Sequence, residues 1–497
     1  MSHMNQQPLN LIILCADEMR GDCLAANGLN PDIQTPHMDG LAARGVNLTR
    51  HFTCFPKCVP ARISMTTGRY THTDGYRTIW QHMPADQPNV LKTLLTLHYE
   101  AAVLGLNHAW ENLHEASHTP PELKPGERGI RIAHHSWTQP LKAIYERYKA
   151  QAPDLTGAAE LLDLDRPLTA DTRYRGDLDA HWDSEAITTQ AIELLTTLRD
   201  RSRPLYLQVN LGPPHPPYAA PEPWYSMYDP EKIAAFPHDL PANAPLSLRK
   251  QREFRTGLHP QQRLLKKMQA VYYAMISRVD AQFGRILRAI EQQGLWDTSI
   301  IVLLSDHGDF AGQYGLSEKW DTTFADCLTH VPCVLAGGGL PAGTTISSLT
   351  DHTDLAPTLL GLLGLTPDWL VHGHDLRPLL EGRVPRVREA VFADGGHEAE
   401  MRRRFSFPGA DNGKQRTYRN CPDSMARAKM IRTDRYKLVI RETGDHELYD
   451  LHTDRWELCN RYQDAALGPV RTDLIEKLLQ WCLRTDTDRP YQHLVGA

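Results

Sequence analysis

The sequence predicts an α/β fold. We expect a large, mixed and mostly parallel sheet flanked by helices, followed by a smaller C-terminal α+β subdomain with a short antiparallel sheet. Continuous apolar runs recur along the 497 residues, and segments with a helical period lie between them. Continuous rather than alternating apolarity is typical of strands that are buried on both faces. Strands that alternate with helices indicate a doubly wound sheet.

The strongest apolar runs mark the expected strands, at residues 9–15, 101–106, 204–210 and 299–305, with a weaker run at 331–335. Helices are expected at 185–198 and 268–290. In the second helix the apolar residues recur every three or four positions, and Gly294 fits a C-cap. Polar clusters follow most of these strands. In doubly wound sheets ligands bind beyond the carboxyl ends of the strands, so we expect the clusters to meet there.

The character of the chain changes near residue 382. Residues 383–423 are rich in arginine, whereas 429–433 and 436–441 alternate like short strands and 470–483 has a helical period. We place a catalytic α/β domain at 5–382 and an α+β subdomain at 383–497, and we expect the second to contribute to the substrate pocket. Residues 112–183 and 218–259 lack clear periodicity, which is typical of lids and specificity loops but equally of variable surface loops.

The composition excludes several classes of protein. A net charge of −6 gives no reason to expect nucleic acid. No apolar run is long enough to span a membrane, and the N-terminus lacks the pattern of a signal peptide. Nine scattered cysteines fit reduced thiols better than a disulfide framework. These properties favour a cytoplasmic protein, and they are compatible with a homo-oligomer.

Acidic residues stand at the ends of two expected strands. Asp17 and Glu18 end the first, and Asp306 and His307 follow the fourth. Close carboxylates repel one another unless a cation neutralises them, so a divalent metal is the natural inference. Oxygen ligands suit Ca²⁺, Mg²⁺ or Mn²⁺, and one imidazole shifts the balance toward Mn²⁺. The alternative is that these residues are solvated strand ends or helix N-caps.

Cys58 has several interpretations when it is considered alone. It could be a buried core thiol, which is the commonest fate of a cysteine. It could pair with Cys54 or share a metal site with it. It could also be a thiol nucleophile activated by Arg62. Considered alone, Cys58 is best interpreted as a buried core thiol.

A family resemblance gives Cys58 a further interpretation. Cys58-Val59-Pro60-Ala61-Arg62, with Thr66-Thr67-Gly68-Arg69 after it, resembles the signature of type I sulfatases of the alkaline phosphatase superfamily. Other family landmarks are matched in the same order along nearly the whole chain, at residues 16–20, 35–42, 214–218, 305–309 with Lys319, 353–360 and 448–451. Several motifs in register make this resemblance specific, where one alone would be weak.

The resemblance implies a function and a set of site residues. A separate maturation enzyme would convert Cys58 to formylglycine (3-oxoalanine), and the enzyme would hydrolyse a small-molecule or saccharide sulfate ester. A divalent metal, Ca²⁺ or alternatively Mn²⁺, would be held by Asp17, Glu18, Cys58, Asp306 and His307. The catalytic residues would be Cys58, Arg62, His108, His215 and Lys319, and of these His108, His215 and Lys319 would also bind substrate. His72 is expected either beside the substrate or in a structural hydrogen bond.

The implied mechanism uses the hydrate of formylglycine. One hydroxyl of this geminal diol, polarised by the metal and Arg62, would attack the sulfur. His215 or Lys319 would protonate the leaving alcohol. The second hydroxyl would then lose its proton and the hemiacetal would expel sulfate. The sulfated intermediate would thereby break down through its own second hydroxyl, which a sulfated serine does not have.

Two positions depart from the family pattern. In the segment Gly105-Leu106-Asn107-His108, Leu106 occupies the place where many sulfatases carry a sulfate-binding lysine. Sulfate binding would be weaker, a cation would come from elsewhere, or the substrate would differ. Glu18 stands where Asp or Gln is commoner, which leaves its role as a ligand open.

Three hypotheses follow. The leading one is a formylglycine-dependent sulfatase. The second, motivated by Leu106, is a phosphonate monoester hydrolase or phosphodiesterase on the same scaffold. The third is a non-catalytic member that binds anionic sugars or scaffolds partners. The retained Cys58, Arg62, Asp306 and His307 argue against it.

Overall fold

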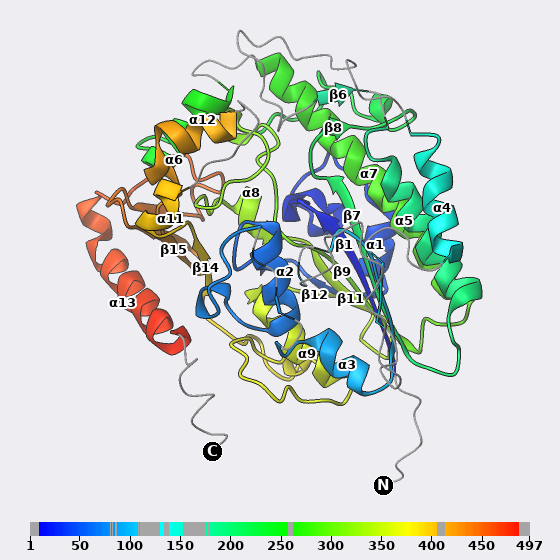
Figure 1. Ribbon diagram of the computed structural model, residues 1–497. Helices are drawn as coiled ribbons and strands as arrows, with labels where there is room; N and C mark the ends of the chain where they lie inside the picture. The colour runs from blue at the N-terminus through cyan, green and yellow to red at the C-terminus, as the bar shows by residue number, and fades with distance from the viewer. Residues whose placement is uncertain are drawn as a thin grey trace.

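The large sheet organises the molecule (Figure 1). The structure is a computed structural model and describes residues 9–79, 81, 83–84, 87–107, 109, 130–133, 139–152, 174–176, 179–256, 262–404 and 413–486. In spatial order the strands are β12 (Thr344–Ile346), β2 (Gly45–Leu48), β11 (Cys333–Ala336), β9 (Ser299–Ser305), β1 (Asn10–Asp17), β7 (Leu205–Pro214), β4 (Glu100–Gly105) and β5 (Ile130–Ala133). Within this sheet only β11 runs against the others. The predicted mixed, mostly parallel sheet is confirmed.

The central strand β1 shows why a continuous apolar run forms at the middle of such a sheet. Ile12, Leu14 and Ala16 point into the hydrophobic cluster on one face, and Leu11, Ile13 and Cys15 point into the cluster on the other. Successive side chains alternate between faces, so a strand covered on both sides must be apolar at every position. The weaker run at 331–335 becomes β11, which is antiparallel to β9. Burial on both faces gives the same apolar run in either direction.

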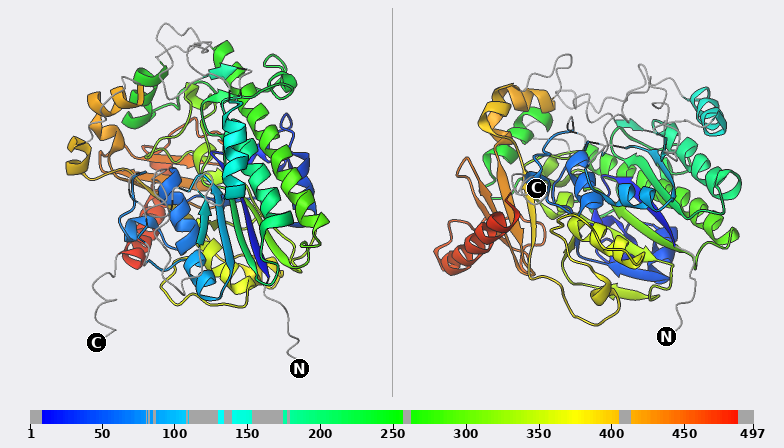
Figure 2. Two further views of the ribbon diagram at one scale, coloured as in Figure 1. Left: turned by 45° about the vertical axis from the view of Figure 1, so that its right-hand side comes forward. Right: turned by 60° about the horizontal axis from the view of Figure 1, so that its bottom comes forward.

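Helices cover the two faces of the sheet (Figures 1 and 2). One face carries α1 (Pro36–Ala43), α5 (Trp182–Glu193) and α7 (Gln262–Gln292), with α4 (Gln139–Lys149) packed on α5. The other face carries α2 (Cys58–Thr67), α3 (Val90–Thr96), α9 (Leu355–Leu362) and α10 (Arg377–Leu380). The helix predicted at 268–290 is the middle of α7, and the one predicted at 185–198 is α5 with the π-helical segment Leu194–Leu198 after it.

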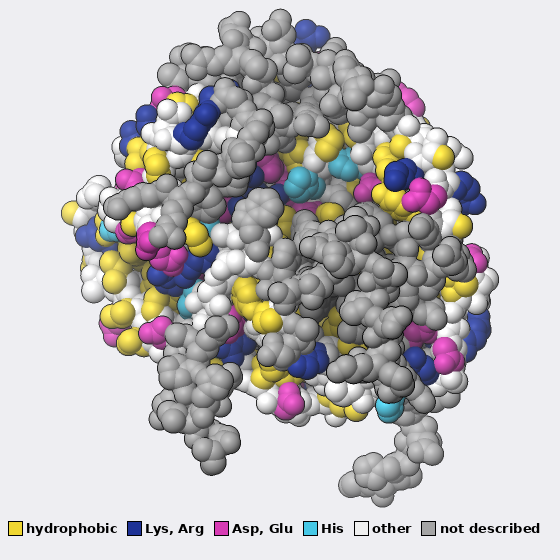
Figure 3. All heavy atoms as spheres, viewed as in Figure 1, with side chains coloured by type: hydrophobic (Ala, Val, Ile, Leu, Met, Phe, Trp, Pro, Cys, Tyr) yellow, Lys and Arg dark blue, Asp and Glu magenta, His cyan; other side chains and the backbone are white. Residues whose placement is uncertain are grey.

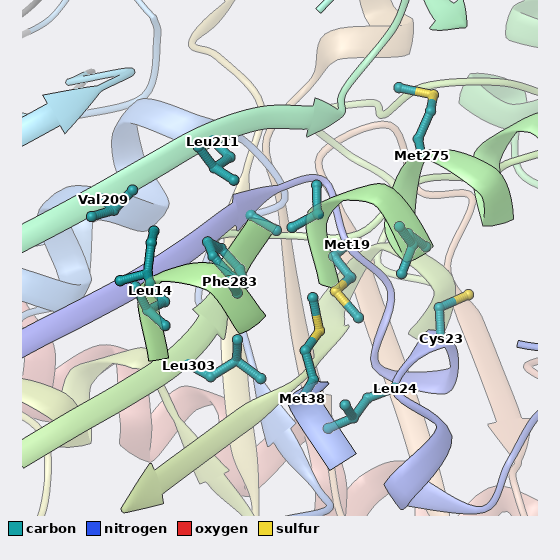
Figure 4. Packing of buried hydrophobic residues seen from close by; sticks show 14 of the residues in the cluster. Leu14, Met19, Cys23, Leu24, Met38, Val209, Leu211, Met275, Phe283 and Leu303 are labelled. Carbon is teal, nitrogen blue, oxygen red and sulfur yellow. The ribbon is translucent and has the colours of Figure 1, made fainter. Parts of the chain in front are cut away.

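The core on the α7 side is continuous from the sheet to the helices (Figure 4). Phe283 of α7 is fully buried and packs with Leu14 of β1 and Leu303 of β9 in one cluster. Met19 and Met38 of the same cluster come from the segment after β1 and from α1. This packing fixes the carboxyl ends of β1 and β9 relative to each other, which positions the residues that follow them.

A second, four-stranded antiparallel sheet follows, in the order β14 (Val391–Gly395), β15 (Ala428–Arg432), β16 (Tyr436–Arg441) and β17 (Glu447–Asp450). The helix α13 (Gly468–Thr485) packs on it through Leu474, Leu478 and Trp481. The short antiparallel sheet is thus confirmed, whereas the boundary at 382 stays a prediction. The remaining short elements are β3 (His51–Phe52), β6 (Tyr174–Gly176), β8 (Tyr218–Ala219), α6 (Leu246–Gln251), α8 (Asp326–Thr329), β10 (His330–Val331), β13 (Thr350–Asp351), α11 (Ala399–Arg404) and α12 (Gly413–Asn420).

Among the contacts that join the small sheet to the large domain, two involve the segment that leads to β14 and β14 itself. Arg388, in the segment that leads to β14, forms ion pairs with the fully buried Asp351 and Asp354. The backbone N–H of Asp394 in β14 donates to the carbonyl of Cys54 at 3.0 Å. The small sheet therefore attaches four residues before Cys58. In the part of the chain that the structure describes, no helix has the length and apolar character needed to cross a membrane.

Candidate active site

The candidate site lies where the sequence predicts it, at the carboxyl ends of the central strands. Asp17 ends β1, Asp306 and His307 follow β9, and Cys58 begins α2. Figure 3 shows histidine and acidic side chains gathered in a hollow near the middle of the face that Figure 1 presents. Asp17, Asp306 and His307 have no exposed surface, and Cys58 is 2% exposed.

Arg62 holds the two aspartates together. Its Nε donates to Asp306 Oδ2 at 2.9 Å and its Nη2 donates to Asp17 Oδ2 at 3.0 Å. Burial acts to lower the pKa of Arg62, but the carboxylates of Asp306 and Asp17 raise it above its usual range. Burial likewise acts to raise the pKa of Asp17, and Arg62, His215 and Lys319 together hold it below its usual range. Both charges are therefore present in this buried cluster.

His307 presents one ring nitrogen to the cluster. Its Nδ1 lies 2.9 Å from the carbonyl of Gly308, and since a carbonyl can only accept, Nδ1 carries the proton. Its Nε2 lies 3.1 Å from Cys58 Sγ and is the ring nitrogen with a lone pair in this tautomer. Glycine is required at position 308, because a Cβ there would lie 2.0 Å from the carbonyl oxygen of Cys327. This fixed tautomer is the one that a metal-binding histidine needs.

Cys58 does not have the surroundings of an activated thiol. Burial is the main reason that its pKa lies well above the usual range, and the charges of Asp17 and Asp306 raise it further against the weaker opposing effect of Arg62. A thiolate is the reactive form of cysteine, so this site disfavours the interpretation of Cys58 as a thiol nucleophile. Cys54 contacts Asp351 instead, and all nine cysteines are free, so the alternative of a disulfide with Cys54 is wrong.

Glu18 adds a third buried carboxylate. It has a positive φ of 67°, a strained conformation for a residue with a side chain. Its carboxylate forms an ion pair with Lys319 and lies 3.4 Å from His215 Nε2. Burial lowers the pKa of Lys319 to about 7. The His215 side chain is 34% exposed, so it is the part of this group that reaches solvent.

The donor set fits a divalent cation. Asp17, Cys58, Asp306 and His307 each place one ligand atom within 4.8 Å of the others, and Asp17, Glu18 and His215 do the same. Glu18 Oε2 is buried and has no hydrogen-bond partner among the described residues. A buried carboxylate oxygen without a donor is costly, and a hard cation satisfies it. The structure thus brings the predicted ligands together, and their binding of a metal stays a prediction.

Leu106 directly follows β4, and its backbone is part of the site. Its carbonyl accepts from Arg62 Nη1 at 3.0 Å, and its N–H donates to the carbonyl of Asn210 at 3.2 Å. Its side chain supplies no charge. His108, two residues later, lies outside the described residues.

His72 lies in other surroundings. Its Nε2 is 2.9 Å from Thr485 Oγ1, and its ring packs against Tyr70 and Trp481. These contacts join α13 to the segment after α2. They correspond to the structural alternative, and the contacts described for His72 involve none of the residues around Cys58.

The structure adds a buried ion pair that sequence reasoning missed, beside Cys58. Lys57 Nζ donates to both carboxylate oxygens of Asp321 at 2.6 Å, and His397 Nε2 lies 3.4 Å from the same carboxylate. Burial acts to raise the pKa of Asp321, but Lys57 and His397 hold it well below its usual range. Lys57 directly precedes Cys58, and Asp321 follows Lys319 by two positions, so the sequence could have predicted that both lie near the site. The place of His397 could not be predicted in this way, because it comes from the segment after β14, far along the chain.

A second missed group surrounds Glu318, which precedes Lys319. Lys414 Nζ from α12 lies 3.0 Å from Glu318 Oε1, and Lys319 Nζ lies 3.7 Å from the same oxygen. Arg255 Nη2 lies 3.4 Å from Oε2. Burial acts to raise the pKa of Glu318, but Lys414, Arg255 and His215 lower it. Two cations from distant segments are thereby held next to Lys319.

Comparisons with known proteins agree with this geometry. The family model described as Sulfatase matches residues 9–365. The chain is 25% identical over 519 residues to the multifunctional alkaline phosphatase superfamily protein PehA of Trinickia caryophylli, with 97% of each chain covered. It is 24% identical over 502 residues to an arylsulfatase of Clostridium perfringens, with 93% of this chain and 99% of that protein covered. Among solved structures, the phosphonate monoester hydrolase of Agrobacterium radiobacter is similar with a TM-score of 0.73, 27% identity and 96% of both chains covered.

Proposed function

This chain belongs to the sulfatase family, and we propose that it hydrolyses sulfate monoesters through a formylglycine made from Cys58, with a divalent metal. One observation carries the proposal. Cys58 Sγ lies 3.1 Å from His307 Nε2 and 3.6 Å from Asp17 Oδ1, at the start of α2 and inside a buried cluster of carboxylates. That sulfur stands where the aldehyde oxygens of formylglycine would be. When present, formylglycine supplies a hydrated aldehyde as nucleophile.

Asp17, Asp306 and His307 would hold the metal, with Cys58 and Glu18 completing the set. The bound ion would supply Lewis-acid stabilisation of negative charge. Ca²⁺ suits the three carboxylates, and Mn²⁺ is the alternative because of the imidazole. Arg62 keeps Asp17 and Asp306 in place, and the amino end of α2 adds partial positive charge at Cys58.

His215 and Lys319 would handle the proton of the leaving alcohol. Both face the carboxylate of Glu18, so they share one side of the site. His215 Nδ1 donates to the carbonyl of Pro216, which leaves Nε2 for the exchangeable proton. The partial exposure of His215 supports this role, because the alcohol would leave toward solvent. Either group can donate a proton to the departing oxygen.

Lys414 and Lys57 are candidates to replace the cation that is missing at Leu106. Lys414 contacts the same carboxylate as Lys319, and Lys57 directly precedes Cys58. Each is already paired with an acid, so its charge is partly compensated. The substrate would be a small-molecule or saccharide sulfate ester, and the segment that carries Lys414 would help to select it.

Phosphonate monoester or phosphodiester hydrolysis is the second candidate function. Leu106 favours it, because the position where many sulfatases carry a sulfate-binding lysine here supplies no cation. The similarity to a phosphonate monoester hydrolase, at 27% identity over nearly the whole chain, supports it as well. Both functions use Cys58, so the transferred group alone distinguishes them.

Peptide mass spectrometry after co-expression with a formylglycine-generating maturation enzyme tests the nucleophile. We expect formylglycine at position 58 in active protein and no turnover by Cys58→Ala. A fully active protein whose Cys58 is an unmodified thiol would contradict the proposal. Comparing kcat/KM on an aryl sulfate, a phosphodiester and a phosphonate monoester then distinguishes the two candidate functions, since a clear preference for the phosphorus esters supports the second.

A further inference from the structure

A polar cavity lies at the opposite end of the sheet from Cys58. It has a volume of about 330 Å³ and is lined by the turn 199–204, by Gln293 and Gly294 after α7, and by Asn10 at the start of β1. These segments lie at the amino ends of β1, β7 and β9, where the strands begin at the lower right of Figure 1. Sites for small molecules typically have volumes of about 300–1,000 Å³.

Three arginines face this cavity from one turn. Arg199, Arg201 and Arg203 alternate along the chain between the π-helical segment after α5 and the start of β7. Among the described residues no carboxylate lies within 4.0 Å of any of their guanidinium nitrogens. Elsewhere in the protein, arginines such as Arg62 and Arg388 are paired with acids at shorter distances than this. The turn therefore carries positive charge that no direct ion pair neutralises.

Arg199 has the least satisfied guanidinium of the three. Its Nε and Nη1 are buried and have no hydrogen-bond partner among the described residues. Burial is the main reason that the pKa of Arg199 is lowered, with Arg201 adding to the effect and Glu100 opposing it. Buried donors without acceptors are rare, so an acceptor that enters beside Arg199 would stabilise its guanidinium.

The other two arginines donate to backbone carbonyls, and Arg201 also donates to Gln293 Oε1. Arg203 Nε and Nη2 donate to the carbonyls of His98 and Tyr99 at 2.8 and 2.7 Å. Arg201 Nη2 donates to the carbonyl of Thr196 at 3.3 Å. These bonds orient the guanidinium groups without neutralising their charge.

The nearby acids do not fill the cavity, because each is used by the turn itself. The carboxylate of Glu100 accepts from the backbone N–H of Asp200 at 2.7 Å. The carboxylate of Asp200 accepts from the N–H and hydroxyl of Ser202 at 3.0 and 2.6 Å. They shape the turn, and in the described part of this region three cations then face two anions.

We propose that this cavity is a second, non-catalytic site that binds a tetrahedral oxyanion, sulfate or phosphate, either free or carried on a small ester. The planar fork of a guanidinium matches two oxygens of such an anion. The anion would lie among the three guanidinium groups, and the Arg199 side chain would turn its buried Nε and Nη1 toward it. The site is independent of the proposed hydrolysis, because none of its residues contacts the cluster around Cys58.

Isothermal titration of the full-length, metal-loaded protein with sodium sulfate, at an ionic strength held constant with sodium chloride, tests the proposal. We expect two classes of site in the wild type, the active site and the cavity. Arg199→Gln should raise the dissociation constant of the cavity class by about tenfold or more, because it removes a charged two-pronged donor. Its kcat/KM on an aryl sulfate should stay at the wild-type value. Arg288→Gln, which alters an exposed arginine of α7, is the matched control and should keep both classes.

Two further measurements keep the proposal testable if Arg199→Gln fails to fold. Arg199→Lys retains the charge and loses the fork, and it should weaken the cavity class alone. Crystals grown with selenate should show an anomalous peak beside Arg199. Titrating Cys58→Ala with a sugar sulfate as well as with inorganic sulfate and phosphate distinguishes a free anion from an ester. Wild-type sulfate binding by the Arg199 variants, or selenate at the active site only, would overturn the proposal and assign the cavity to water.

Discussion

Replacing Arg62 with alanine tests the metal site by thermodynamics. Arg62 is 2% exposed and bridges Asp17 and Asp306 at 3.0 and 2.9 Å. The substitution leaves two buried carboxylates without their shared counter-charge. Removing one partner of a buried ion pair costs about 3–5 kcal/mol, so the free energy of unfolding of the metal-free protein should fall by at least about that amount. The lost donor to the carbonyl of Leu106 adds to the loss.

Ca²⁺ should restore most of this stability, because the ion places two positive charges against the same carboxylates. A ligand that binds only the folded state adds about 4 kcal/mol at 1,000 times its dissociation constant, which is comparable with the loss. Chemical denaturation in EDTA and in saturating Ca²⁺ measures both quantities. The gain with Ca²⁺ should therefore be larger in Arg62→Ala than in the wild type.

Arg69→Ala is the matched control. Arg69 is also buried, donates to both carboxylate oxygens of Asp74 at 3.0 and 3.2 Å, and donates to the carbonyl of Leu370 at 3.2 Å. Arg69→Ala therefore loses the same kinds of bonds as Arg62→Ala. The carboxylate that Arg69 binds, that of Asp74, is not a proposed metal ligand. The gain of Arg69→Ala with Ca²⁺ should equal that of the wild type. Equal gains in both variants would refute Asp17 and Asp306 as the metal ligands.

Leu106→Lys adds an ammonium group beside the site. It should raise the ratio of kcat/KM for an aryl sulfate to kcat/KM for a phosphonate monoester by about tenfold, which is the effect of one good charged contact. An unchanged ratio would mean that position 106 does not contact the transferred group. Lys414→Gln should raise KM for the sulfate ester more than it lowers kcat, whereas Lys414→Arg should resemble the wild type. Full activity of Lys414→Gln would mean that Lys414 only holds α12 in place. Burial lowers the pKa of His72 to about 3, whereas an unfolded chain has about 6.5. The unfolded state therefore takes up the proton first, and the free energy of unfolding should fall by about 1.4 kcal/mol per pH unit below pH 6.5 through this side chain. Denaturation of His72→Gln between about pH 7.5 and 5 should show a shallower slope, and the wild-type slope in the variant would contradict this assignment.

The central strands could be predicted because burial on both faces leaves a signal in single segments. β1, β7 and β9 each satisfy that signal, and the residues that follow them meet at one edge for topological reasons. Asp17, Asp306 and His307 were therefore predictable as a cluster before any distance was known. The family resemblance then supplied the role of Cys58, which its own surroundings in the sequence left open.

The contribution of the C-terminal part could not be read in the same way. β14 lies inside the arginine-rich stretch 383–423, which contains few apolar residues, and no strand was expected there. His397 and Lys414 reach the site through tertiary packing on Asp321 and Glu318, to which no periodicity in the sequence corresponds. Likewise the three arginines around residue 201 form a cavity only because the turn after α7 lies beside them.

The near-complete burial of Cys58 limits when, during synthesis and folding, another protein can reach it. Leu11 of β1 pairs with both Tyr206 and Ile300, so the sheet edge that encloses Cys58 cannot close until roughly three-fifths of the chain has left the ribosome. If Cys58 is converted to formylglycine as we propose, the maturation enzyme would have to reach it in that interval, because the finished fold leaves it 2% exposed. Folded protein that carries the thiol should resist conversion, whereas the same chain diluted from denaturant into the maturation enzyme should accept it. Equal conversion of both would mean that the site opens far enough to admit another protein's active site.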